Sequence, residues 1–175
     1  MTYEVRPNGV TQKGNPYTVR GSLLKVGDTA PDFTVITPTG DPRTLVNYAG
    51  KIKIISSVAS LSGRICNAQT RQFNQEAANL SENIVVLTVS SDTPDEQQNW
   101  CEAAGIDRVE VLSCSADMRF SDDYGVHIVD LGMNQRSIFV LDSNNKVVYV
   151  EYVPEIAMEA NLDAALAAAQ LALTL

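Results

Sequence analysis

The chain has 175 residues, 45% of them apolar and 19% charged, which is typical of one soluble globular domain with a proper core. A net charge of −8 argues against nucleic-acid binding, because no basic patch offsets the acidic excess. The apolar stretch 162–175 is too short to span a membrane, and the N-terminus carries no evident secretory signal. We therefore predict a single cytoplasmic domain over residues 1–175, with neither nucleic acid nor membrane as a partner.

Cysteine usage limits the chemistry further. Cys66, Cys101 and Cys114 form no CxxC pair, and His127 is the only histidine. Too few soft ligands remain for a zinc site, and the missing CxxC argues against a thioredoxin-type disulfide reductase. We predict no metal and no cofactor. The thiols are then either structural or the source of a peroxide-type redox pair.

Taken in chain order, residues 1–24 predict an N-terminal hairpin extension. Short β-type segments at 3–5 and 17–19 are accompanied by turn residues at Asn8-Gly9 and at 14–16. A strand is expected at 33–36 and another at 52–58, the second entering a loop at 60–63. Apolar residues then recur at helical spacing, which predicts a helix over 64–80.

The second half continues the alternation. A continuous apolar run predicts a buried strand at 84–89, and Thr93 and Pro94 open a helix that stops at Gly105. A strand at 109–112, a short helix at 116–124, a hairpin of 137–141 with 146–150 and an alanine-rich helix at 158–173 follow. This order predicts an α/β three-layer domain with a mixed sheet.

Cys66 stands out because it falls in the first turn of the helix that follows the 60–63 loop. Unpaired N–H groups and the positive end of the helix dipole stabilise a thiolate at such a position. Cys66 is also the first residue of the apolar stripe of that helix, so it could simply be a small buried side chain. The spacing alone leaves both interpretations open.

With these elements in order, the chain resembles the bacterial thiol peroxidase family, the atypical two-cysteine peroxiredoxins, over nearly its full length. The resemblance is carried by several short blocks that occur in the family's order. These blocks are GNPYTV at 14–19, VGDTAPDF at 26–33, Cys66 with RQFN at 71–74, Ser90 and DTP at 92–94, WC at 100–101, GI at 105–106, YGV at 124–126, RSIFVLD at 136–142 and YVPE at 152–155.

The resemblance implies a thioredoxin-like fold that reduces hydroperoxides. Cys66 matches the peroxidatic position and Cys101 the resolving one, so that a Cys66 sulfenic acid would condense into an intramolecular Cys66–Cys101 disulfide. Thioredoxin would reduce this disulfide, and Arg136 would support the thiolate and polarise the peroxide. Family members usually form homodimers. Cys114 matches no catalytic position, so we interpret it as structural.

Two residues depart from the family pattern. The family's loop has a proline and a threonine where this chain has Ala59 and Gly63. The threonine hydroxyl bonds both thiolate and peroxide, and Gly63 supplies no such donor, so Ser60 and Ser62 are the candidate replacements. The change also leaves a rival open: a peroxiredoxin-fold protein with weak or lost turnover that acts as a redox-sensitive binding or sensor protein.

Overall fold

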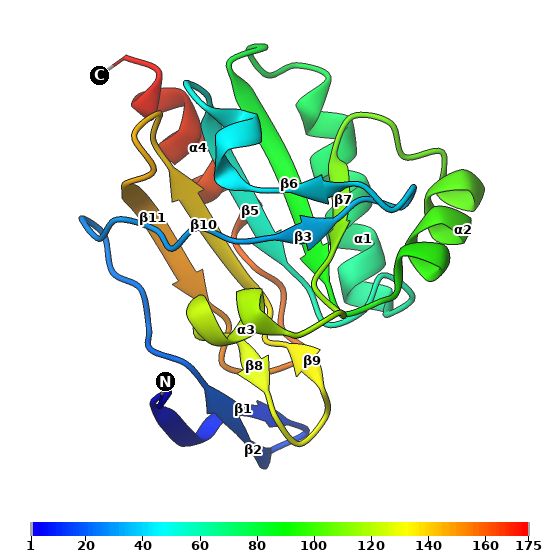
Figure 1. Cartoon of the computed structure of the whole chain (residues 1–175), viewed down its shortest axis with the longest axis vertical. Helices are drawn as coiled ribbons and strands as arrows, with labels where there is room; N and C mark the ends of the chain where they lie inside the picture. Colours follow the sequence, from blue (N-terminus) through cyan, green and yellow to red (C-terminus); the bar gives the residue numbers. More distant parts are fainter. Residues whose placement is uncertain (1, 175) are drawn as a thin grey trace.

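The computed structural model describes residues 2–174 and is built around a seven-stranded mixed sheet (Figure 1). The strands lie in the order β11-β10-β5-β6-β7-β3-β4. Their bounds are β3 Val35–Ile36, β4 Pro42–Arg43, β5 Ile52–Ser57, β6 Ile84–Ser90, β7 Glu110–Ser113, β10 Ser137–Leu141 and β11 Val147–Tyr152.

Three parallel strands form the middle of this sheet, and antiparallel strands flank them. β5, β6 and β7 pair in parallel, whereas β10 runs antiparallel to both β5 and β11. Every residue of β5 and of β10 is buried, as expected for strands covered on both faces. The predicted mixed sheet is confirmed.

Helices and an irregular segment cover the two faces of the sheet and give the predicted three layers. The helices α1 (Arg64–Ala77), α2 (Pro94–Ala104) and α4 (Leu162–Ala172) supply residues to one apolar cluster. On the other face, α3 (Arg119–Asp123) packs with the irregular segment 30–48, which includes the 3₁₀ helix η1 (Leu45–Tyr48). No helix within residues 2–174 is long and apolar enough to cross a membrane.

The N-terminal hairpin is confirmed, but its turn is not at Asn8-Gly9. The strands β1 (Val5–Gln12) and β2 (Asn15–Arg20) meet at the turn before Asn15. Asn8 has φ 62°, and the pairing register shifts between Arg6 and Val10, so Asn8-Gly9 forms an irregularity within β1. Two residues that favour positive φ therefore bend a strand here instead of ending it.

Helix boundaries also differ from the sequence expectation. The last helix begins at Leu162 rather than at 158, because Asn161 caps it by accepting a hydrogen bond from the Ala164 N–H at 3.0 Å. α3 begins only at Arg119, since Met118 before it has a left-handed φ of 56°. The alanine-rich composition predicted the helix, and the capping residue determined where it starts.

A second, four-stranded sheet joins the hairpin to the body of the protein. It has the order β1-β2-β8-β9, where β8 is His127–Ile128 and β9 is Met133–Asn134. The only histidine of the sequence, His127, therefore lies in a short strand of this sheet. The hairpin pairs with the chain just before Arg136, which enters the main sheet through β10.

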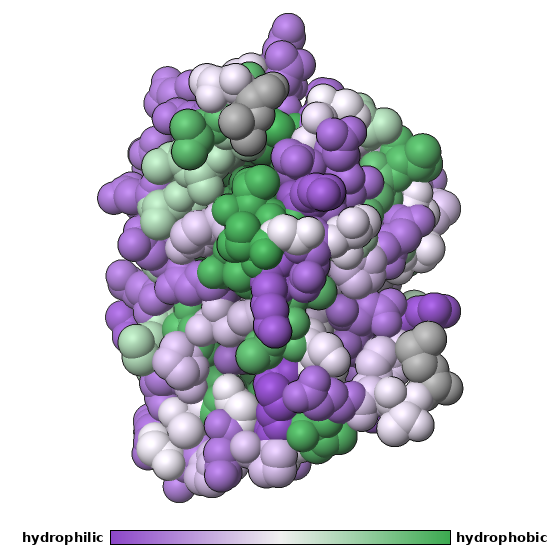
Figure 2. All heavy atoms as spheres, turned by 90° about the vertical axis from the view of Figure 1, so that its left-hand side faces the viewer, coloured by the Kyte–Doolittle hydropathy of each residue, from purple (hydrophilic) through white to green (hydrophobic). Residues whose placement is uncertain are grey.

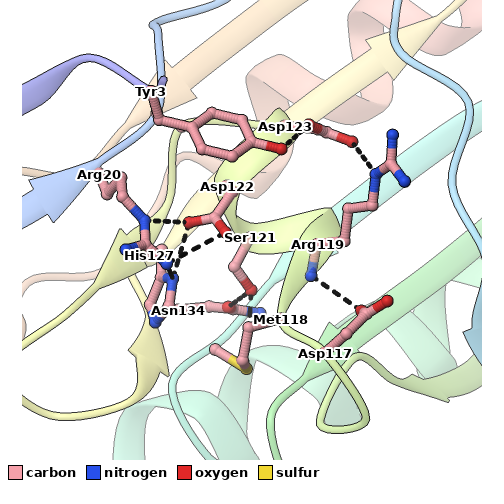
Figure 3. Close-up of polar contacts among 12 residues, drawn as sticks. Tyr3, Arg20, Asp117, Met118, Arg119, Ser121, Asp122, Asp123, His127 and Asn134 are labelled. Carbon is pink, nitrogen blue, oxygen red and sulfur yellow. Dashed lines mark hydrogen bonds and ion pairs between the residues drawn. The ribbon is translucent and has the colours of Figure 1, made fainter. Parts of the chain in front are cut away.

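Figure 3 shows the polar contacts that fasten the hairpin to α3. Asp122 accepts from Arg20 Nε at 2.7 Å and lies 2.8 Å from His127 Nδ1. Tyr3 donates to Asp123, which also pairs with Arg119 at 3.5 Å. These contacts join the hairpin, α3 and β8 into one unit.

One side of the molecule, on which β11 forms the edge of the main sheet, carries a band of apolar side chains between polar ones (Figures 1 and 2). Five of the six β11 residues are only partly buried. A contiguous apolar band of this kind is a common feature of interaction surfaces.

The close contact between the hairpin and α3 generates a stability prediction. Gly21 has φ +110°, and a Cβ there would lie 2.1 Å from the Asp122 carbonyl oxygen. We expect Gly21→Ala to lower the free energy of unfolding by more than about 2 kcal/mol, measured by urea denaturation.

Gly14→Ala is the matched control for this experiment. Gly14 also has a positive φ, +81°, but among the described residues no atom lies within 4 Å of a Cβ placed there. We expect a loss of roughly 1 kcal/mol from backbone strain alone. Equal losses in the two variants would contradict the close approach at Gly21.

Candidate active site

Cys66 is the third residue of α1 and lies at the carboxyl end of β5, where the 58–63 loop joins strand and helix. Gly63 is the N-cap of α1 and makes no side-chain capping bond, so the first turn is not capped by its own cap residue. The Cys66 side chain is 3% exposed and packs in the cluster that contains Val58 and Leu61. Cys66 therefore fits both interpretations of the sequence, because it is buried in the core and also lies in the first turn of a helix.

Arg136 reaches Cys66 from the opposite side of the site. It precedes β10, is 4% exposed, and donates from Nη1 to the Cys66 Sγ at 3.3 Å. Its other donors are fixed by backbone carbonyls, Nε to Met158 O and Nη2 to Ile156 O, both at 2.9 Å. The segment before α4 therefore holds the guanidinium in place, and Met158 within it was predicted as the first residue of the helix.

No carboxylate neutralises this guanidinium. Within residues 2–174, no Asp or Glu oxygen lies within ion-pair distance, 4.0 Å, of Arg136. Buried charges in proteins are normally paired, because an isolated charge loses its hydration without compensation. The sulfur of Cys66 is the group beside Arg136 that can carry the compensating negative charge.

Neither Ser60 nor Ser62 contacts the sulfur. The Ser60 hydroxyl donates to Asp92 Oδ1 at 2.9 Å, and the exposed Ser62 places its oxygen 3.0 Å from that of Ser60. Asp92 also accepts from the Leu61 N–H at 2.8 Å. The structure thus brings the Ser60 hydroxyl to Asp92 and the Ser62 hydroxyl to Ser60, rather than either of them to Cys66.

The absent threonine leaves a defined space. Gly63 has φ −68°, which any residue can adopt, and a Cβ there would lie 3.8 Å from the Cys66 Sγ. The same Cβ would lie 3.3 Å from the Ser60 carbonyl oxygen, a tight but adjustable contact. A threonine at position 63 would therefore place its hydroxyl beside the sulfur, and Gly63 has no side chain that could supply one.

Cys101 lies in the third turn of α2, and the three cysteines are free. Asp92, just before α2, bonds the loop just before α1, so the two helices start at the same level. Cys101 is the eighth residue of α2 and Cys66 the third of α1, so the two lie ~7.5 Å apart along the helix axes. Neighbouring helix axes are themselves ~8–10 Å apart, so the Cα atoms of Cys66 and Cys101 are farther apart than the ~7 Å that a disulfide allows.

Burial changes the acidity of the two other thiols. Desolvation raises the pKa of the half-buried Cys101 above its ordinary value. It also raises the pKa of Cys114, whose sulfur lies 3.3 Å from Ser90 O and 3.4 Å from both Ser121 Oγ and Asn134 Nδ2. These contacts place Cys114 in the packing between β7 and α3, remote from the Arg136 contact.

Sequence reasoning missed Asp92 as part of the site. It appeared there only within the DTP block at 92–94, and Thr93 is the residue that caps α2, through a reciprocal capping box with Glu96. An acid two residues after a buried strand, at the sheet edge where the loop before Cys66 also begins, is a signal that could have identified it. The carbonyls that hold Arg136 leave no such signal in the sequence.

Comparisons with known proteins agree with this architecture. Residues 25–166 match the Redoxin family model. The chain is 47% identical to a thiol peroxidase of Bacillus subtilis over 161 residues, which is 92% of this chain and 96% of that protein. It is 45% identical to a thiol peroxidase of Halalkalibacterium halodurans over 164 residues, 94% of this chain and 98% of that one.

Solved structures give the same result. A peroxiredoxin-like protein from Aquifex aeolicus superposes with a TM-score of 0.87 at 34% identity, covering 98% of this chain and 99% of that one. A thiol peroxidase from Chromobacterium violaceum, 19% identical, shares the fold with a TM-score of 0.80 over 89% and 91% of the two chains. The fold, the Redoxin match and the identity over nine-tenths of the chain show that this protein belongs to the thiol peroxidase family of thioredoxin-like peroxiredoxins.

Proposed function

We propose that this thiol peroxidase reduces hydrogen peroxide and organic hydroperoxides through Cys66, with Cys101 as the resolving thiol and Arg136 as the supporting cation. One observation carries the assignment. A buried guanidinium without a carboxylate partner among the described residues donates to the sulfur of Cys66 at 3.3 Å. A thiolate at Cys66 supplies the missing charge and is also the nucleophile that the reaction requires.

In the first step, the Cys66 thiolate attacks the terminal oxygen of the hydroperoxide. An S–O bond forms, the O–O bond breaks, and the leaving oxygen takes a proton to become water or an alcohol. Arg136 stabilises negative charge at the sulfur and on the oxygens by charge-assisted hydrogen bonds. The bonds from Nε and Nη2 to backbone carbonyls keep its guanidinium in the orientation that this requires. The start of α1 adds the positive end of its dipole.

In the second step, Cys101 attacks the sulfenic sulfur of Cys66. The S–S bond forms, the S–O bond breaks, and the oxygen leaves as water. The spacing of the cysteines requires the first turn of α1 or part of α2 to unwind for this step. Thioredoxin then reduces the disulfide, and the working form is a homodimer in the cytoplasm.

The second candidate is a redox-sensitive binding or sensor protein that turns over slowly or not at all. The observation in its favour is that Gly63 offers no donor and that Ser60 and Ser62 bond elsewhere. Loss of one preorganised donor commonly costs ~10²–10³ in rate. Such a loss slows the reaction of Cys66 with peroxide, while the contributions of Arg136 and of the α1 dipole remain.

The first test is peroxide consumption with thioredoxin, thioredoxin reductase and NADPH, followed by stopped flow. We expect Cys66→Ser to abolish turnover, because it removes the nucleophile. Cys101→Ser should retain one rapid reaction with peroxide and then fail to recycle through an intramolecular disulfide. Cys114→Ser should turn over as the wild type does.

Wild-type turnover no greater than that of Cys66→Ser, with either hydrogen peroxide or cumene hydroperoxide, would remove the peroxidase proposal and favour the sensor. Turnover supported by another dithiol but not by thioredoxin would replace only the reductant. Light scattering during size-exclusion chromatography tests the homodimer separately.

Gly63→Thr tests the missing hydroxyl. A threonine there places its Cβ at ordinary contact distance from the sulfur, so its hydroxyl can donate to the thiolate and the peroxide. We expect the second-order rate constant for peroxide reduction to rise by at least about tenfold, measured by competition with a peroxidase of known rate. Gly63→Ala is the control, since it adds the same Cβ without the hydroxyl; an equal gain in both variants would exclude the hydroxyl as the cause.

The pH dependence of disulfide formation follows from Cys101. Burial raises the pKa of this thiol above its ordinary value of 9.0, so its thiolate fraction keeps increasing with pH over the whole range from 7 to 9. We expect the peroxide-independent step to accelerate throughout this range, measured by rapid quench and mass spectrometry. A plateau already below pH 8 would contradict attack by a buried Cys101.

A further inference from the structure

The segment that carries Cys66 packs in the core through Leu61 and Cys66 and has few polar contacts with the rest of the described chain. Beyond α1 itself, and among the described residues, side-chain hydrogen bonds tie residues 60–66 to the rest of the chain at Asp92 and at Arg136. The Arg136 contact is made to the reacting sulfur and is lost when that sulfur leaves the site. Asp92 is then the remaining polar tie.

Asp92 contacts the loop with both carboxylate oxygens. Oδ1 accepts from the Ser60 hydroxyl at 2.9 Å, and Oδ2 accepts from the Leu61 N–H at 2.8 Å. Oδ2 also accepts from the Ser90 hydroxyl at 2.7 Å, at the end of β6. Hydrogen bonds to an ionised group are stronger than neutral ones, so this carboxylate is a substantial restraint on the loop.

The backbone of Asp92 is equally fixed. Its carbonyl oxygen accepts from the Ser113 hydroxyl at 2.6 Å, at the end of β7, and the next residue is the N-cap of α2. One residue therefore joins the ends of two parallel strands, the loop before Cys66 and the helix that carries Cys101. Both elements that must rearrange for the disulfide to form meet at this residue.

We propose that Asp92 is a positioning residue that latches the Cys66 loop to the start of the Cys101 helix and limits the rate at which the two sulfurs meet. This inference rests on the proposed function, because it concerns the second step of that reaction. In the closed state the latch keeps Cys66 beside Arg136, where the thiolate reacts with peroxide. Opening frees the loop, and the disulfide forms with release of water.

The latch also controls a competing reaction. While the loop stays closed, a second hydroperoxide can transfer an oxygen atom to the Cys66 sulfenic acid, giving a sulfinic acid and one more molecule of water or alcohol. The longer the latch holds, the larger the fraction of sulfenic acid that follows this route. A weaker latch should therefore speed disulfide formation and protect Cys66 from overoxidation.

Asp92→Ala tests this inference, with Asp95→Ala as the matched control. Asp95 is an exposed acid three residues further on, in the first turn of α2, so both variants lose one negative charge at the same helix start. Trp100 is the only tryptophan and is adjacent to Cys101, so its fluorescence reports the second step in stopped flow. Mass spectrometry of Cys66 after turnover at increasing peroxide gives the concentration that overoxidises half of it.

For Asp92→Ala we expect the peroxide-independent fluorescence phase to accelerate about tenfold, which corresponds to about 1.4 kcal/mol. The peroxide concentration for half overoxidation should rise by a similar factor, while Asp95→Ala stays within about twofold of the wild type. Ser60→Ala removes only the contact with Asp92 Oδ1, so the fluorescence phase should accelerate by a smaller factor. This variant tests the inference even where Asp92→Ala does not fold.

An unchanged or slower phase in Asp92→Ala and Ser60→Ala, with a normal Cys66–Cys101 disulfide in the wild type, would overturn the latch alone. A wild type that forms no such disulfide with peroxide would overturn the proposed function, and the latch with it. A purely structural role for Asp92 lowers stability without shifting the division between disulfide and sulfinic acid.

Discussion

The contact between Arg136 and Cys66 is the interaction on which the arrangement of the site depends. A guanidinium 4% exposed, with no acid beside it in the described chain, is costly unless a neighbouring group carries negative charge. The sulfur of Cys66, 3.3 Å away, is the group beside Arg136 that can carry that charge. The same contact therefore fixes the place of the buried guanidinium and supports the role proposed for Cys66.

Much of the fold serves to hold Arg136 where that contact is possible. β10, buried along its whole length between β5 and β11, fixes its backbone, and the carbonyls of Ile156 and Met158 fix its guanidinium. The hairpin contributes as well, because it pairs with the chain that leads into Arg136 through β8 and β9. It also bonds the segment that holds the guanidinium, since the Thr11 carbonyl oxygen accepts from the Ile156 N–H at 2.8 Å.

The sequence predicted the elements better than their boundaries and their contacts. Periodic apolar residues identified β5, α1 and β6, because burial imposes that pattern along a continuous segment. The start of α4 was wrong, since Asn161 caps the helix and the Met158 carbonyl before it bonds Arg136, more than fifteen positions away. Ser60 and Ser62 are beside Cys66 in sequence, yet the Ser60 hydroxyl bonds Asp92, which is remote in sequence, and the Ser62 hydroxyl bonds Ser60.

The two departures from the family pattern make Asp92 more important for holding the loop before Cys66. Glycine at position 63 and alanine at position 59 leave the loop more conformational freedom than a threonine and a proline would. A loop that is less rigid by itself depends more on contacts with the rest of the chain to keep its place beside Cys66. Asp92 and Arg136 are the two residues that supply those contacts, one to the loop and one to the sulfur. Tertiary hydrogen bonds to Asp92 and from Arg136 thus hold the loop and the sulfur in this protein, whose loop lacks the threonine and the proline of the family pattern.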